Sequence, residues 1–247
     1  MPVLEAEEIR VQFGGLLAVH SATLAVDAGR ITGLIGPNGA GKTTLFNVIS
    51  GVTEPNAGCI RLDGRDISGL APHKRARLGI GRTFQRLEVF STMSVRDNIR
   101  TGVEIRQTWD GSRRDPGPEV AELLDRVGLE GVADLRVDQI PTGQARLVEL
   151  ARALAIRPRV LLLDEPASGL DDVETDQLGE LLVVLADAGL GILLVEHDVG
   201  LVMRICARVA VLDLGCVIAE GDAASVQRDP AVLDAYLGRA PLDGGQA

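Results

Sequence analysis

Glycine, lysine and threonine recur at a chemically informative spacing in residues 36–43, which read GPNGAGKT and fit the pattern G-x-x-x-x-G-K-T. Glycines at these positions let successive backbone N–H groups turn toward phosphate oxygens. Lys42 would neutralise β- and γ-phosphates, and Thr43 would offer its hydroxyl to Mg²⁺. Only two of the 25 Lys and Arg residues are lysines, and one of them is Lys42. The run predicts a phosphate-binding loop made of Gly36, Pro37, Asn38, Gly39, Ala40, Gly41, Lys42, Thr43 and Thr44.

Two adjacent acids form a second chemical element. Asp164 and Glu165 follow the apolar stretch at residues 160–163, which reads as a strand. In open α/β sheets ligands bind at the carboxyl ends of the strands, so both side chains should lie beside the loop. Asp164 can hold Mg²⁺ through water, and Glu165 can orient or deprotonate the water that attacks the γ-phosphate. Together with the loop, the pair predicts a nucleotide hydrolase.

The surrounding pattern predicts the elements that position these residues. Short alternating stretches at 3–11 and 17–26 indicate an N-terminal antiparallel sheet. A strand at 30–35, the loop and a helix at 44–50, followed later by strand, helix and strand at 160–163, 173–188 and 191–195, indicate a parallel sheet with covering helices. We therefore expect an α/β fold of the P-loop NTPase type in a single domain over residues 1–238. A helical lobe is inserted at about 87–158, a hairpin follows at 209–220, and residues 239–247 form a flexible tail.

Composition and charge exclude several classes of protein. A hydrophobic content of 46% with 24% charged residues is typical of an ordered globule. The longest apolar run, residues 181–195, is interrupted by Asp187, Gly189 and Gly191, which argues against a membrane span, and the N-terminus lacks the pattern of a signal peptide. A net charge of −10 argues against nonspecific nucleic-acid binding.

Charge is nevertheless uneven along the chain. Residues 61–114 hold 12 Lys and Arg against 6 Asp and Glu, an excess of six positive charges that leaves −16 on the remainder. Two interpretations stay open: a solvated arginine face, or a docking surface for lipid headgroups or an acidic partner.

A third element narrows the class of hydrolase. Residues 140–144, Ile-Pro-Thr-Gly-Gln, precede a helix expected at 145–156, and Gly143 lies 21 residues before Asp164. In this order the chain resembles, over nearly its whole length, the ATP-binding subunits of ABC transporters, whose signature is usually written LSGGQ. Pro141 and Thr142 stand where that signature has serine and its first glycine, so the serine hydroxyl that would contact the γ-phosphate is absent.

The resemblance implies the ABC ATPase fold and roles for further residues. It implies that Phe13 stacks on adenine, that Gln85 is the Q-loop glutamine serving catalysis and Mg²⁺, that Asp171 belongs to the D-loop, and that His197 is the switch histidine. Gly143 and Gln144 would complete the nucleotide site of a facing chain, so that two ATP molecules lie between two such domains.

Partners follow from the same resemblance. It implies a second ABC ATPase subunit, in a homodimer or a heterodimer, transmembrane permease subunits and, indirectly, a substrate-binding protein, with no nucleic acid. The chain would act as a peripheral protein at the cytoplasmic face of the membrane.

Two finer motifs resemble the branched-chain amino acid importer subfamily: PHKR at 72–75 followed by GIGRTFQ at 79–85, and RDPAVLDAYLG at 228–238. Importers of urea or short amides and the ATPase of lipopolysaccharide export share parts of the second. Alternatives are an exporter ATPase of the lipopolysaccharide type, a soluble ABC ATPase acting on nucleic acid, and another P-loop enzyme such as a kinase. Soluble ABC ATPases usually carry a second cassette, a coiled-coil insertion or zinc cysteines, and the chain has none of these.

Overall fold

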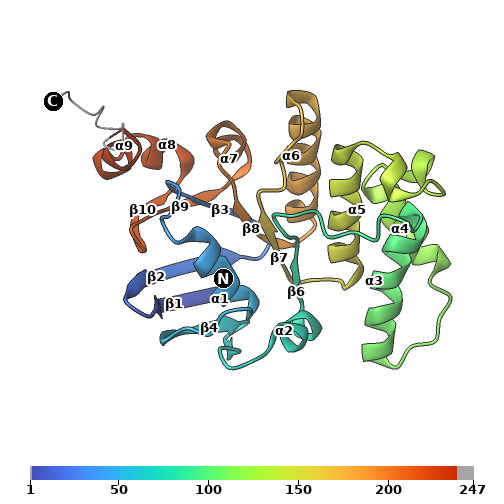
Figure 1. Ribbon diagram of the computed structural model, residues 1–247, viewed down its shortest axis with the longest axis horizontal. Helices are drawn as coiled ribbons and strands as arrows, with labels where there is room; N and C mark the ends of the chain where they lie inside the picture. The colour runs from blue at the N-terminus through green and yellow to red at the C-terminus, as the bar shows by residue number, and fades with distance from the viewer. Residues whose placement is uncertain (1, 238–247) are drawn as a thin grey trace.

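Two β-sheets lie side by side in the computed structural model, which describes residues 2–237 (Figure 1). The antiparallel sheet has the order β2-β1-β4-β5, and the larger sheet has the order β10-β9-β3-β8-β7-β6. In the larger sheet β9, β3, β8, β7 and β6 run parallel, and β10 pairs antiparallel with β9. The strands are β1 (Pro2–Phe13), β2 (Leu16–Asp27), β3 (Ile31–Ile35), β4 (Ala57–Leu62), β5 (Arg65–Asp66), β6 (Ile80–Arg82), β7 (Val160–Asp164), β8 (Gly191–Val195), β9 (Arg208–Asp213) and β10 (Cys216–Gly221).

The helices cover the larger sheet and build a lobe at one end of the molecule, on the right of Figure 1. This lobe contains α3, α4 and α5, which lie inside the range expected for the insertion. The helices are α1 (Lys42–Ser50), α2 (Pro72–Leu78), α3 (Val95–Asp110), α4 (Gly117–Arg126), α5 (Thr142–Ala155), α6 (Asp172–Asp187), α7 (Val199–Ile205), α8 (Ala223–Gln227) and α9 (Pro230–Leu237), with short 3₁₀ turns at Glu130–Val132 and Val137–Gln139.

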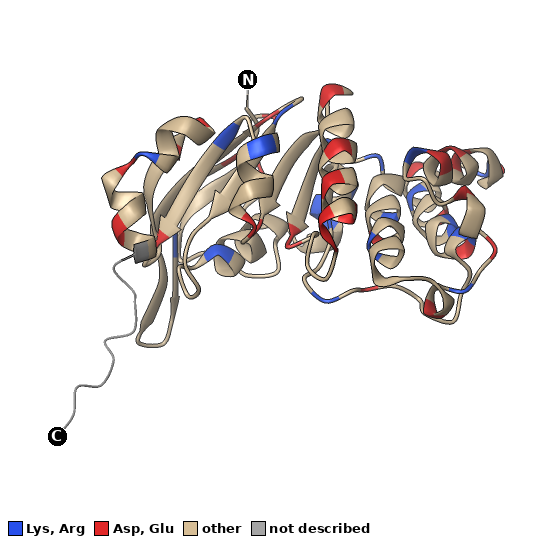
Figure 2. Ribbon diagram, turned by 90° about the horizontal axis from the view of Figure 1, so that it is seen from above, with Lys and Arg blue, Asp and Glu red and all other residues tan. Residues whose placement is uncertain are grey.

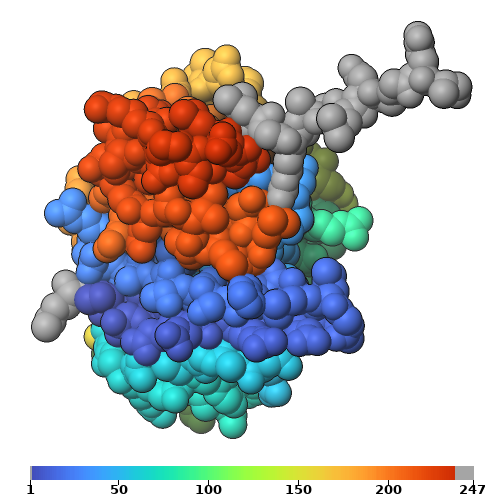
Figure 3. All heavy atoms as spheres, turned by 90° about the vertical axis from the view of Figure 1, so that its left-hand side faces the viewer, coloured from blue at the N-terminus to red at the C-terminus, as the bar shows by residue number. Residues whose placement is uncertain are grey.

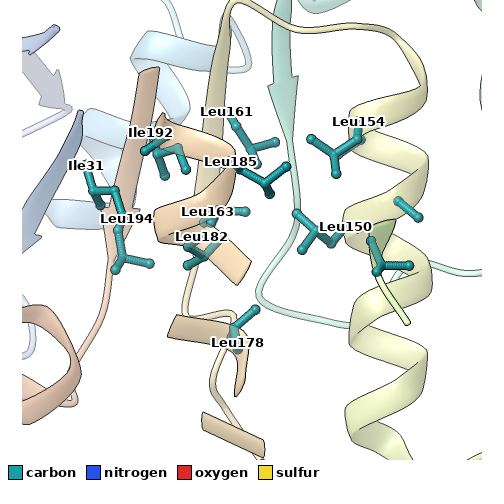
Figure 4. Packing of buried hydrophobic residues seen from close by; sticks show 14 of the residues in the cluster. Ile31, Leu150, Leu154, Leu161, Leu163, Leu178, Leu182, Leu185, Ile192 and Leu194 are labelled. Carbon is teal, nitrogen blue, oxygen red and sulfur yellow. The ribbon is translucent and has the colours of Figure 1, made fainter. Parts of the chain in front are cut away.

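The central strands are buried on both faces, as continuous apolar stretches in a parallel sheet should be. Alternate residues of β7 enter different cores. Leu161 and Leu163 join the cluster that includes α5 and α6, whereas Leu162 joins the cluster that includes α1 and the antiparallel sheet. Figure 4 shows the first of these, with Leu182 and Leu185 of α6 beside the strand leucines. The carboxyl ends of β3, β7 and β8 are thereby fixed relative to one another.

The α/β architecture with an antiparallel sheet, a parallel sheet and a helical lobe confirms the expected fold class. Some expected boundaries were wrong. α5 begins at Thr142 and not at Ala145, because Pro141 has the extended backbone of an N-cap. Four helices, α2, α7, α8 and α9, were not expected at all; each has eight residues or fewer, too short for a clear helical period.

The C-terminal elements lie at the end of the molecule opposite the lobe. Figure 3 shows this end, with β1 and β2 as a band between the C-terminal segment and residues from about 50 to 80. The expected tail at 239–247 lies outside the described residues. No helix within residues 2–237 combines the length and apolarity needed to cross a membrane.

Several arginines in the basic stretch at 61–114 are bound to other groups of the chain, some inside the fold and some at its surface. Arg75 is fully buried and donates to four backbone carbonyls, of Val48, Ile49, Ser68 and Leu70. Others pair with carboxylates: Arg61 with Glu7, Arg96 with Asp134, Arg100 with Glu104, and Arg106 with Asp110 and Glu119. Figure 2 shows positions of both signs interspersed over the lobe and acidic positions along α6. The stretch is therefore not a uniform cationic face.

Candidate nucleotide site

Residues 36–41 connect β3 to α1 through a backbone that requires glycine. Gly36 has φ 149°, and a Cβ there would lie 2.0 Å from the carbonyl oxygen of Leu212. Gly41 has φ 105°, and a Cβ would lie 2.5 Å from the carbonyl oxygen of Ala18. The Leu212 carbonyl of β9 and the Ala18 carbonyl of β2 therefore lie too close to the loop for a side chain at position 36 or 41. Glycine at both positions allows the backbone N–H groups to turn toward phosphate oxygens.

The Lys42 ammonium lies within this loop. It donates to the carbonyl oxygens of Gly36 at 2.6 Å and Pro37 at 3.0 Å. Burial lowers the pKa of Lys42, and the carboxylates of Glu165 and Asp164 oppose that shift. Lys42, the expected phosphate ligand, is therefore a partly desolvated cation with the carboxylates of Asp164 and Glu165 nearby.

Asp164 and Glu165 stand at the carboxyl end of β7, beside the loop. Asp164 is 5% exposed, and burial together with the neighbouring charge of Glu165 raises its pKa, while Arg82 counteracts the rise. Glu165 has φ 49°, a left-handed conformation that is strained for a non-glycine residue. Its backbone N–H donates to the carbonyl of Val195 at 2.8 Å.

Gln85 and His197 both approach Glu165. The Gln85 Nε2 donates to the Glu165 Oε2 at 3.3 Å, and the His197 Nδ1 lies 3.9 Å from the same oxygen. The structure thus brings Gln85 and His197, which are far apart in the sequence, to the same carboxylate oxygen of Glu165.

Glu196 was not among the residues expected from the sequence. It is 1% exposed and directly follows β8, just as Glu165 follows the end of β7. In the sequence, Glu196 could be noticed only as an acid that directly follows an apolar strand, a pattern that an ordinary surface residue also shows. Its burial in the structure is what distinguishes Glu196 from a surface acid.

Residues 84–88 are hydrogen-bonded to side chains of α5. Arg146 donates to the carbonyls of Phe84 at 3.2 Å and Gln85 at 2.9 Å, and Glu149 accepts from the Phe84 N–H at 3.1 Å. One helical turn further, Arg152 donates to the carbonyl of Glu88 at 2.6 Å. Residues 84–88 are therefore held along one face of α5 by its side chains, an arrangement that the sequence did not indicate.

The amino-terminal turn of α5 lies against α6. Gly143 is buried, and a Cβ there would lie 2.3 Å from a carboxylate oxygen of Glu174. The Gln144 Oε1 is buried and accepts no hydrogen bond within residues 2–237. Asp171 caps α6 by accepting from the Glu174 N–H at 2.8 Å. No hydrogen bond or ion pair among the described residues joins Gly143, Gln144 or Asp171 to the loop at 36–44.

Phe13 ends β1 and has 53% of its surface exposed. An exposed aromatic at a strand end can stack on a flat ring. For a cation, Thr43 and Asp164 supply a hydroxyl and a carboxylate, and Gln85 an amide oxygen; these hard oxygen donors suit Mg²⁺. The loop, the ammonium and this donor set fit a Mg²⁺–nucleotide.

Family comparisons agree with this geometry. A family model described as "ABC transporter" matches residues 19–168, more than half of the chain. The chain belongs to this family. It is an ABC ATPase, the ATP-binding subunit of a transporter. A second model, described as "Branched-chain amino acid ATP-binding cassette transporter", matches residues 216–241 of this ABC subunit.

Curated relatives of this ABC subunit cover almost the whole chain. BraF of Pseudomonas aeruginosa, a high-affinity branched-chain amino acid transport ATP-binding protein, is 39% identical and covers 97% of this chain and 99% of its own. LivG of Salmonella typhimurium, described in the same words, is 37% identical with the same coverage. LptB of Escherichia coli K12, a lipopolysaccharide export system ATP-binding protein, is 36% identical and covers 96% of this chain and 98% of its own.

Solved structures show the same fold. A nucleotide-free ATP-binding cassette from an ABC transporter superposes with a TM-score of 0.86 at 28% identity, covering 96% of this chain and 99% of that one. The ADP conformation of another cassette gives 0.85 at 29% identity, with the same coverage.

Proposed function

We propose that this ABC subunit powers the import of branched-chain or related amino acids. The observation that carries the amino-acid assignment is the match of residues 216–241 to the branched-chain amino acid cassette model. The names of the relatives BraF and LivG support it. We treat residues 1–238 as one ATP-binding domain with the helical lobe inserted at about 87–158.

The proposed chemistry is hydrolysis of the γ-phosphate of ATP. The backbone of residues 36–41 and the Lys42 ammonium bind the phosphates, while Phe13 stacks on the adenine. Thr43, Asp164 and Gln85 would hold Mg²⁺, which supplies charge neutralisation at the phosphate oxygens. Glu165 orients and deprotonates the attacking water, because its carboxylate lies beside Lys42, Gln85 and His197.

Gln85 donates to the Glu165 Oε2, and the His197 Nδ1 lies 3.9 Å from the same oxygen, so we assign both residues a part in directing the carboxylate toward the water. The remaining assigned residues serve a dimer. We propose that the amino-terminal turn of α5, with Gly143 and Gln144, meets the phosphate bound by a second ABC subunit, through its helix dipole and backbone. Asp171, whose side chain caps α6, lies in the loop that would face that subunit.

Membrane permeases are the proposed partners at the outer face of residues 84–90. Phe84 and Phe90 are exposed there, with 41% and 47% of their surfaces accessible, although both lie beside arginines that stack on their rings. Exposed aromatics with cations beside them are suited to a protein interface. The ABC subunit would then sit peripherally at the cytoplasmic face of the membrane, and a substrate-binding protein would deliver the amino acid on the other side.

Uptake measurements test the transport assignment. A strain lacking the gene should lose uptake of radiolabelled leucine, isoleucine or valine, and the wild-type gene should restore it while the Glu165→Gln gene should not. Uptake of an unrelated solute, such as a sugar, serves as the control. Unchanged uptake of all three amino acids in the deletion strain would refute the import proposal.

LptB provides the specific observation for a second candidate, because it is 36% identical over nearly the same length. Under that alternative, depletion of the ABC subunit would lower lipopolysaccharide at the cell surface and leave amino-acid uptake intact. The two measurements on one depletion strain separate the candidates.

A further inference from the structure

Glu196 carries a carboxylate that is completely enclosed in the protein. Its side chain has no accessible surface. The Oε1 accepts from the Ala167 N–H at 2.8 Å, and the Oε2 accepts from the His197 N–H at 3.1 Å. The His197 Nδ1 lies 3.6 Å from the same Oε2. One carboxylate therefore joins the loop after β7 to the loop after β8.

The enclosure is costly. Among residues 2–237 no arginine or lysine forms an ion pair with Glu196, so backbone N–H groups and the neighbouring imidazole are its compensation. Burial raises its pKa, and the N–H donors of Ala167, His197 and Asp198 oppose the rise. An apolar residue would fill the same space without the cost of burying a charged group. A carboxylate at this position is therefore best explained by the backbone N–H groups that its two oxygens bind.

The Oε1 of Glu196 holds the turn that contains Glu165, through its hydrogen bond from the Ala167 N–H. Glu165 keeps a strained left-handed backbone, with φ 49°, which persists only where neighbours enforce it. Two contacts to the end of β8 do so: the Glu165 N–H donates to the Val195 carbonyl, and the Ala167 N–H donates to Glu196. Val195, the last residue of β8, and Glu196, the residue after it, therefore bind the strained residue itself and the residue two positions after it.

The same carboxylate fixes the other side of the site. By accepting the His197 N–H, Glu196 fixes the backbone position from which the imidazole extends. The Nδ1 of that imidazole lies 3.9 Å from the Glu165 Oε2. The buried Glu196 thus helps to determine the distance between Glu165, the proposed base, and His197, the proposed switch histidine.

We propose that Glu196 is a positioning residue for ATP hydrolysis, one that holds Glu165 and His197 at a fixed separation, an inference that rests on the catalytic role proposed for Glu165. Glu196 is shielded from solvent and acts through the two loops that its oxygens bind. Its removal should affect turnover while leaving the phosphate-binding loop unchanged.

Steady-state ATPase of the purified full chain with Glu196→Gln tests the proposal. A glutamine has one oxygen acceptor, and its amide nitrogen cannot accept the second N–H, so one of the two loops is released. A displacement of the base by a fraction of an ångström should lower kcat by about 10- to 100-fold. The KM for ATP should stay within about twofold, because Lys42 and residues 36–41 are not in contact with Glu196.

The matched control is Asp198→Asn, the same carboxylate-to-amide change two residues away. Asp198 caps α7 by accepting from the Leu201 N–H, and asparagine caps helices equally well, so kcat should not change. A double variant supplies the second test. If Glu196 acts through Glu165, adding Glu196→Gln to Glu165→Gln should lower the residual rate by less than about twofold.

The outcomes separate this inference from the proposed function. Substantial hydrolysis by Glu165→Gln alone would remove the basis of both. Loss of activity in Glu165→Gln with full kcat in Glu196→Gln would overturn only the role of Glu196. Equal damage to kcat, KM and the unfolding midpoint would make Glu196 merely structural. Should Glu196→Gln not fold, Glu196→Asp keeps the charge but is one methylene too short to reach both loops; the same fall in kcat at constant KM is expected, and an unchanged kcat would overturn the inference.

Discussion

The Arg146 guanidinium donates to the backbone carbonyl of Gln85 at 2.9 Å, and this bond joins the segment after β6 to α5. Gln85 contacts Glu165 in the site of the chain's own loop. Arg146 lies one turn after Gly143, in the helix proposed to serve the partner's nucleotide. A displacement of Gln85 would therefore be passed to that helix through a short, direct connection.

Arg146→Lys tests this connection. An ammonium cannot bridge two carbonyls in the fixed fork geometry of a guanidinium, so residues 84–85 should loosen. We expect a loss of about 1–2 kcal/mol in the free energy of unfolding and a fall in kcat, with ATP affinity retained. Urea unfolding and steady-state ATPase measure the two effects. Arg100→Lys, in an exposed pair with Glu104, should change the unfolding free energy by less than about 0.5 kcal/mol. Equal, small effects of both variants would contradict a fastening role for Arg146.

Glu149 should make stability depend on pH in a defined direction. Burial raises the pKa of this 5%-exposed carboxyl above its ordinary value of 4.5, although the Phe84 N–H and Arg146 act against the rise. The folded state therefore binds the proton more tightly than the unfolded state, and its stability falls as pH rises from 4.5 through the raised native pKa. Glu149→Gln lacks this titration. The unfolding free energy of the wild type minus that of the variant should decrease through the window and then level off.

Urea unfolding at a series of pH values measures that difference. Asp134→Asn provides the opposite case, because the hydrogen bond from Arg96 lowers the pKa of Asp134 below 3.8. The stability that Asp134 contributes is present above 3.8 and is lost as pH falls through the lowered native value. A difference that grows with pH for Glu149 would show that its carboxyl is stabilised as the anion, against the expectation.

Gly36→Ala should be far more harmful than Gly39→Ala. At Gly36 a Cβ would collide with the Leu212 carbonyl oxygen, and relief requires the loop or β9 to shift, at a cost of about 3 kcal/mol or more. At Gly39 the space is open, and only the left-handed φ of 81° opposes alanine, by about 1–2 kcal/mol. Thermal unfolding gives the order directly. A more stable Gly36→Ala than Gly39→Ala would show that β9 does not confine the loop.

Glu165→Gln should keep ATP binding and lower turnover by about 100-fold or more, because the amide cannot take the proton of the attacking water. ATP should then accumulate uncleaved between two ABC subunits, so the variant should migrate as a dimer in size-exclusion chromatography with Mg²⁺ and ATP. Glu180→Gln, on the exposed surface of α6, is the control and should hydrolyse ATP like the wild type. Rapid turnover by Glu165→Gln would remove the proposed base.

Local chemistry was readable from the chain. The glycines, Lys42 and Thr43 lie in one short run between an apolar strand and a helix, so the motif can be recognised from the sequence alone. Asp164 and Glu165 were predicted for the same reason, since an apolar strand followed by acids places them at a sheet end. The family and the fold class followed from the order of these motifs and were confirmed.

Contacts between segments distant in sequence were decided by the tertiary structure. The burial of Glu196 depends on β8 lying against β7, and the bonds from Arg146 and Glu149 to residues 84–85 depend on how the lobe packs. The enclosure of Gly143 by Glu174 needs α5 and α6 side by side. A residue type and its neighbours in sequence define what a side chain can bind, whereas burial and spatial partners arise only when separate elements share one core, so the sequence determined the chemistry and the packing decided which groups hold it in place.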